Sequence, residues 1–166
     1  MKTLTRRPHI IPRTLRQQQS KPIIACTYCN NVHYKNVWYA QNSRFALLID
    51  EKKDSIFYSI CPACEMQRDG KYEGVLYLRD VPTELDDKVM SLILREAEQD
   101  FIENPQHRVL EFSDIHDGHK ITANSAKMVQ RIGKRIQEVF GPCELQSTYR
   151  QEPHPLQIAK ITFVGP

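Results

Sequence analysis

The second half of the chain shows apolar residues at strand and helix spacing. The segment EGVLYLRD, residues 73–80, has the pattern of a strand. Pro82 and Thr83 then begin a predicted helix, with Thr83 as the N-cap. Asp86, at the third helical position, is placed to pair with this N-cap residue. Asn104-Pro105 ends this helix. Its apolar positions recur at helical spacing and are Leu85, Val89, Leu92, Ile93, Ala97 and Phe101.

A hairpin and a second helix follow. The segments RVLEFSDI (108–115) and HKITAN (119–124) flank Asp117-Gly118, which is a strong hairpin signal. Ser125 is predicted to cap a helix that ends at Gly141-Pro142. The apolar stripe of this helix is Val129, Ile132, Ile136, Val139 and Phe140. Two strands, residues 143–151 and 156–164, are predicted to complete the unit.

The predicted order of elements is β-α-β-β-α-β-β. Two helices that each have one apolar face must lie together on one side of a mainly antiparallel sheet. The predicted fold class of residues 71–166 is therefore α+β, a two-layer sandwich related to the split β-α-β family.

Shorter strands are predicted nearer the start of the chain. Residues 23–25 lead into a first cysteine pair, and residues 37–39 form a short strand. Residues 44–50 and 55–60 flank the polar turn EKKD, and the second of these strands leads to another cysteine pair. Two cysteine-bearing turns separated by a three-stranded meander predict a zinc ribbon over residues 23–70.

The two cysteine pairs have the spacing of a metal site. Cys26 and Cys29 are separated by two residues, as are Cys61 and Cys64, which is the two-plus-two arrangement of a tetrahedral thiolate site. Zinc is the predicted ion. Iron in a rubredoxin-like site would use the same ligands, but no other feature of the sequence suggests electron transfer. Four cysteines close the coordination shell, so the ion is predicted to be structural rather than catalytic.

The sequence supports a metal site better than other roles for these cysteines. A redox couple at the CPAC motif needs a strand-to-helix turn, whereas the residues after Cys64 show no apolar helical face. Asn30, just after the first pair, tolerates a positive φ, and Glu65 tolerates it less well. His33 is left outside the ligand set because four cysteines fill it. Cys143 is predicted to be a buried strand residue.

Basic residues are concentrated at the start of the chain. The formal net charge is +3, yet residues 1–22 contain no Asp or Glu, so the rest of the chain is net acidic. This basic arm is predicted to be disordered and to gain affinity for phosphate backbones by releasing counterions. A solubilising tail or a transit peptide is the alternative. Its basic residues are Lys2, Arg6, Arg7, Arg13, Arg16 and Lys21.

Two further groups of basic residues are candidates for contacts with nucleic acid. Lys127, Arg131, Lys134 and Arg135 gather on one side of the second helix, although Glu138 shares that side and a solvated charged face would look the same. In the ribbon, Lys35 and Arg44 alternate with aromatic residues that can stack on bases. The aromatic residues are Tyr34, Trp38 and Tyr39, and Trp38 is the natural core residue of so small a module.

Several functions lack their sequence signals. No apolar run approaches the roughly 20 residues of a membrane-spanning helix, and no secretory signal opens the chain, so a cytoplasmic protein is expected. Nucleotide-binding, nucleophile-elbow and HExxH motifs are absent. Asp114, His116, Asp117 and His119 crowd one turn, but Asp and His are ordinary turn residues. We therefore expect no enzymatic activity and no small-molecule substrate.

Several segments resemble a known family. CTYCNNVHYKNVWY, ICPAC, YEGVLYLRD and RVLEFSDIHDGHKITANSAKMVQRIGKRIQEVFG resemble small bacterial zinc-ribbon proteins. They are also distantly similar to the amino-terminal part of the nonsense-mediated-decay protein three family, the export adapter of the large ribosomal subunit. The resemblance covers residues 25–164 and implies that Cys26, Cys29, Cys61 and Cys64 correspond to zinc ligands. The larger relatives carry additional cysteine pairs and a further domain with trafficking signals, so shuttling between compartments is not implied.

The sequence thus predicts a cytoplasmic, non-enzymatic adapter that uses the basic arm and a rigid ribbon to associate with RNA or a ribosomal subunit. The alternative is a protein-interaction module in transcription or stress response, with a structural zinc and no RNA binding. Affinity that falls steeply with salt would favour the first prediction.

Overall fold

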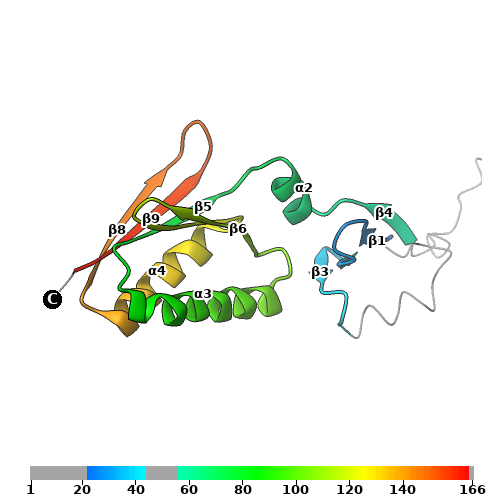
Figure 1. Ribbon diagram of the computed structural model, residues 1–166. Coiled ribbons are helices and arrows are strands. Elements are labelled where there is room, and N and C mark those ends of the chain that lie inside the picture. The colour runs from blue at the N-terminus through cyan, green and yellow to red at the C-terminus, as the bar shows by residue number, and fades with distance from the viewer. Residues whose placement is uncertain (1–21, 44–55, 165–166) are drawn as a thin grey trace, which may run out of the picture.

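The computed structural model describes residues 22–43 and 56–164. It contains two sheets, each with its own group of buried apolar residues (Figure 1). The sheet nearer the start of the chain has four strands, and the second has five. This α+β architecture, a cysteine-bearing region followed by a sandwich, confirms the predicted fold class. The basic arm and the predicted strand 44–50, with Arg6, Arg7, Arg13, Arg16 and Arg44, lie outside the described residues.

The first sheet holds the cysteines and has the strand order β3-β2-β1-β4. Its strands are β1 (Ile23–Cys26), β2 (Val32–Tyr34), β3 (Val37–Tyr39) and β4 (Ile56–Ser59). β1, β2 and β3 pair antiparallel in sequence order, whereas β4 pairs with β1 in parallel. β2 was not predicted, nor was the pairing of β4 with β1, and the middle strand of the predicted meander, residues 44–50, lies outside the described residues. The parallel register sets Cys26 opposite Ser59, so both cysteine pairs begin at the same end of the sheet.

A short helix that the sequence pattern did not predict follows β4. It is α2 (Pro62–Arg68), with Cys61 as its N-cap and a proline at its first position. Proline is well suited there because its missing N–H would have no helical partner in any case. The expectation that no helix follows Cys64 is therefore wrong. Glu65 lies inside α2 and has no positive φ, whereas Asn30 has φ 56° as expected.

The sandwich has the predicted order of elements. They are β5 (Gly74–Arg79), α3 (Thr83–Glu103), β6 (Val109–Ile115), β7 (Gly118–Ala123), α4 (Ala126–Phe140), β8 (Cys143–Arg150) and β9 (Leu156–Phe163). Ser125 caps α4 as predicted, because its side chain accepts a hydrogen bond from the backbone N–H of Met128. Thr83 is not the N-cap of α3, since Pro82 takes that place without a side-chain hydrogen bond. The hairpin loop is His116-Asp117, one residue earlier than predicted.

The five-stranded sheet has the order β6-β7-β5-β9-β8 and is antiparallel except where β9 pairs with β5. α3 and α4 lie together on one side of it, as Figure 1 shows. The core fills the space between the two layers with side chains of strands and helices, including Leu76, Leu78, Ile93, Ile132 and Ile136. Of the predicted helical stripes, Val139 departs from the core and is 48% exposed. Among the described residues, no helix is long and apolar enough to cross a bilayer.

Candidate metal centre

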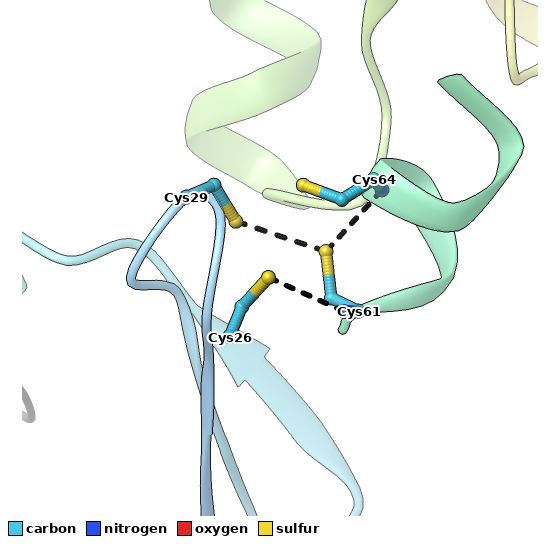
Figure 2. Close-up of side chains that lie close together, drawn as sticks. All are labelled: Cys26, Cys29, Cys61 and Cys64. Carbon is cyan, nitrogen blue, oxygen red and sulfur yellow. Dashed lines mark hydrogen bonds between the residues drawn. The ribbon is translucent and has the colours of Figure 1, made fainter. Parts of the chain in front are cut away.

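Four cysteine side chains converge between the first sheet and α2 (Figure 2). Cys26 ends β1, and Cys29 follows it in the turn before β2. Cys61 precedes α2, and Cys64 lies in its first turn. Because β1 and β4 run parallel, the turn after β1 and the start of α2 meet at one end of the sheet. Cys26, Cys61 and Cys64 are buried, and Cys29 is partly exposed.

The sulfur atoms have the separations that a tetrahedral ion needs. All four lie within 4.8 Å of one another, and the Sγ atoms of Cys29 and Cys61 are 3.7 Å apart. Four sulfurs placed about 2.3 Å from a zinc ion would be about 3.8 Å apart, so the cluster is close to the size of a filled site. All four are free thiols with no disulfide between them. The residues present therefore fit a metal ion bound by four thiolates, which is the predicted ligand set.

Backbone amides point at the sulfurs. The Sγ of Cys26 accepts hydrogen bonds from the N–H groups of Tyr28, at 3.5 Å, and Cys61, at 3.3 Å. The Sγ of Cys61 accepts one from the N–H of Cys64, at 3.4 Å, which is the side-chain cap of α2. Such donors favour the thiolate over the thiol. The same bonds hold the sulfur atoms in place before a metal arrives.

The pKa of Cys26 differs from those of Cys61 and Cys64. Burial raises the pKa of Cys26, but backbone N–H donors outweigh it and lower the pKa to about 6. Burial raises the pKa of Cys61, and burial together with the neighbouring Cys61 and Cys29 sulfurs raises the pKa of Cys64 to about 12. Several thiolates crowded together repel one another, so a cation is needed to hold them all in the charged form. A divalent ion would supply that charge and displace the remaining protons.

Arg108, in the loop between α3 and β6, brings a positive charge to the cluster. Its Nη1 donates to the Sγ of Cys64 at 3.4 Å, and its Nη2 donates to the Sγ of Cys29 at 3.2 Å. Nη2 also lies 3.9 Å from the Sγ of Cys61. One guanidinium thus contacts both cysteine pairs. Four thiolates around a divalent ion carry a net charge of −2, which a cation beside them stabilises.

The loop between α3 and β6 holds Arg108 in this place. The Nε of Arg108 donates to the carbonyl of Pro105 at 3.0 Å, and its guanidinium carbon lies 5.7 Å from the centre of the Phe101 ring. Two further bonds join this loop to the cysteine-bearing region. Asn31 donates to the carbonyl of Pro105 at 3.3 Å, and the N–H of Ala63 donates to the side chain of Gln106 at 3.1 Å. The sandwich therefore contacts the metal centre directly.

The structure removes one argument against a redox couple but adds a stronger one for a metal. The CPAC motif does sit at a strand-to-helix turn, since α2 begins at Pro62. A redox couple needs only its own two sulfurs, however, and here Cys26 and Cys29 lie beside them within the same cluster. His33 stays outside that cluster, with its ring 5.1 Å from the ring of Trp38. Trp38 packs against the cysteines, as expected for a core residue.

The basic residues predicted on α4 have two different environments. Arg131 forms ion pairs with Asp100 at 2.6 Å and Glu96 at 3.6 Å, both on α3. Arg135 lies 3.9 Å from Glu96 and 3.1 Å from Glu138. These two cations are partly neutralised and help to join the helices. Lys127 and Lys134 are exposed.

Lys35 is exposed in the β2–β3 turn. Its φ of 49° is one of two consecutive positive values, with Asn36 at 69°. Its Nζ lies 5.2 Å from the centre of the Tyr34 ring. A charged side chain at such an exposed turn can reach a partner.

The acidic and histidine residues of the β6–β7 hairpin form a local network. The ring nitrogens of His119 lie 2.9 Å from Asp114 and 2.7 Å from Asp86 of α3. Burial lowers the pKa of His119, but its bonds to the two carboxylates outweigh this and raise the pKa above its usual value. Asp117 forms an ion pair with Arg79. These contacts connect the hairpin to α3 and β5.

Cys143 lies on β8 and is 9% exposed, as predicted for a buried strand residue. Its burial raises its pKa. Sequence reasoning missed Arg108, because nothing near it in the sequence marks its contact with cysteines 44 and 79 positions away. A comparison of the sequence with models of known protein families found no match, and a comparison with curated proteins found none either.

Proposed function

We propose that this protein is a non-enzymatic adapter whose cysteine cluster holds a structural zinc ion and which associates with RNA on ribosomal particles. The observation that supports it most is the closed set of four sulfurs with Arg108 beside them. Four thiolates leave no open position for a substrate, and zinc is the usual ion of such sites. A small cysteine-rich region gains its rigidity from the ion, since its own core is limited to a few residues.

The RNA part of the proposal is supported by charge and by resemblance. The acid-free basic segment 1–22 suits a phosphate backbone, and the distant resemblance of residues 25–164 to a ribosome export adapter suggests the same kind of partner. On this proposal, the ion fixes the first sheet against the sandwich through Arg108. The two regions then present one rigid surface to a large particle.

Metal content is the first test. Purified protein is expected to contain one zinc per chain by mass spectrometry of the metal. Cys61→Ser should lose that zinc, whereas Cys143→Ser, the matched control outside the cluster, should keep it. Iron in place of zinc would correct the identity of the ion, and protein with no stoichiometric metal would overturn the proposal.

Gradient sedimentation is the second test. The protein in a cell lysate is expected to travel with ribosomal particles at low salt and to leave them as salt rises, because phosphate contacts weaken with ionic strength. Removal of residues 1–22 should lower the salt concentration at which it leaves. A protein that stays at the top of the gradient at low salt does not bind ribosomal particles.

A protein partner is the second candidate, favoured by exposed aromatic residues of the first sheet. Tyr28, Phe57 and Tyr58 are 67%, 63% and 71% exposed. Phe57 and Tyr58 lie on β4, which is an edge strand among the residues that the structure describes. Large apolar side chains at such an edge are typical of protein interfaces. Association that survives high salt and is lost in Phe57→Ser would favour this candidate.

A further inference from the structure

The five-stranded sheet has one face without helices. Leu76 and Leu78 of β5 are fully buried in the core between the sheet and the helices. Successive strand residues point to opposite faces, so Tyr77 and Arg79 lie on the other face. Figure 1 shows α3 and α4 together on one side of the sheet, which leaves this face open. We call it the open face.

Strand register places two lysines on either side of Tyr77. Lys120 of β7 is opposite Tyr77, and Lys160 of β9 is opposite it on the other side. The row continues to Ser113 of β6 and Gln146 of β8. With strands about 4.8 Å apart, this row crosses about 19 Å of the sheet. Tyr77, Lys120 and Lys160 are all partly buried, and none of them is fully covered.

A second aromatic ring lies on the open face. The Nζ of Lys120 is 5.7 Å from the centre of the Tyr72 ring, in the segment that leads into β5. Because Lys120 points to the open face, the ring of Tyr72 lies on that side as well. Two tyrosines and two lysines thus alternate over the middle of the sheet.

The charge of this surface is positive at its centre. The strand positions of this face on the three central strands contain no acid; Val75 and Thr122 are buried, and the others are Tyr77, Arg79, Gly118, Lys120, Ile158, Lys160 and Thr162. Glu111 and Glu144 lie on the two edge strands, and Asp117 pairs with Arg79. Among the described residues, Lys160 has no acidic partner. Lysines that form no ion pair among the described residues can pair with an anionic partner.

We propose that the open face binds single-stranded RNA, with bases stacked on Tyr77 and Tyr72 and phosphates paired with Lys120 and Lys160. This inference rests on the proposed association with RNA and names the surface that makes the contact. Flat aromatic rings can stack only on bases that are not already paired in a duplex, so the surface selects single strands. A protein partner could also pack against the two rings, but only an acidic protein would pair with the two lysines.

The test uses the full-length, zinc-loaded protein and a fluorescein-labelled oligouridine, which forms no duplex by itself. Binding is measured by fluorescence anisotropy over a series of salt concentrations. The variants are Tyr77→Leu, Tyr77→Phe and the double variant Lys120→Gln/Lys160→Gln. Lys127→Gln/Lys134→Gln tests the basic residues of α4, and the matched control is Lys88→Gln/Arg95→Gln, which removes two exposed cations from α3. Zinc content and the urea midpoint of each variant show that it is folded.

Tyr77→Leu is expected to weaken binding about tenfold, as the loss of one stacked base does, and Tyr77→Phe should retain affinity. The lysine double variant should weaken binding and reduce the slope of log affinity against log salt by about 1.4, because each lost phosphate contact on a single strand accounts for about 0.7. A duplex of equal length should compete poorly.

Three results would overturn the inference. If the wild type binds oligouridine and the open-face variants bind equally well, the protein contacts RNA elsewhere and only the surface is wrong. Loss of binding in the α4 variant alone would place the contact on that helix. A wild type that binds no RNA, in this assay or on ribosomal particles, would refute the association with RNA and this inference with it.

Discussion

Replacing Arg108 with glutamine should weaken metal binding without unfolding the sandwich. The guanidinium donates two hydrogen bonds to sulfur, at 3.2 and 3.4 Å, and its third contact, at 3.9 Å, is too long to count. A hydrogen bond to a charged group contributes about 1.5–3 kcal/mol. Sulfur is a weaker acceptor and Arg108 is partly exposed, so we take about 1 kcal/mol for each bond. The sum, about 2 kcal/mol, corresponds to about 30-fold in the dissociation constant of zinc.

The assay is competition for zinc with a coloured chelator at constant pH, which gives that dissociation constant directly. Arg108→Lys should lie between the wild type and glutamine, because lysine keeps the charge but cannot contact both cysteine pairs with one planar group. Arg95→Gln, on the exposed side of α3, is the matched control and should bind zinc as the wild type does. If Arg108→Gln changes the constant by less than twofold, the guanidinium does not stabilise the thiolates and the reasoning fails.

Three further predictions concern the sandwich. Gly118→Ala should lower the free energy of unfolding in urea by several kcal/mol, because its Cβ would lie 2.0 Å from the carbonyl oxygen of Leu78. The control is Gly70→Ala, whose Cβ meets no atom within 4 Å and which should lower it by about 1 kcal/mol. Equal losses in the two variants would contradict this prediction. His119→Gln should reduce stability more at pH 6 than at pH 8. The pKa of His119 is raised in the folded protein, so the protonated ring stabilises the fold below about pH 6.5, and this contribution is lost as pH rises through the folded pKa. Urea titrations that show no pH trend would refute the prediction. Ser125→Ala should cost about 1 kcal/mol in the same assay, through the lost cap of α4.

The helices that could be predicted from the sequence are those with apolar residues at regular helical spacing. α4 has a cap at Ser125, a strong apolar stripe and a Gly-Pro stop, and its predicted start agrees with the structure. α2 has only seven residues, and its buried positions are Ala63 and Cys64 rather than an apolar stripe. Its signal in the sequence was the Cys-Pro step, where a capping side chain precedes a proline at the first helical position.

Strand pairing and the surroundings of the metal were harder to predict. The parallel pairing of β1 with β4 joins strands that lie far apart in the sequence, and no local pattern specifies it. The spacing of the cysteines identified the four sulfurs, because two residues between ligands suffice to point both at one ion. Arg108 lies in the loop before β6 and contacts cysteines that are 44 and 79 positions away in the sequence. Contacts of this kind are set by tertiary structure alone.

The position of β9 has a consequence for how the sandwich is made during translation. β9 follows β8 along the chain but is inserted between β8 and β5, where it pairs with both. Until residues 156–163 have left the ribosomal exit tunnel, β5 has one unpaired edge and the core lacks Ala159, Ile161 and Phe163. Between the synthesis of β5 and that of β9, the emerging chain therefore carries an exposed strand edge, a known route to aggregation.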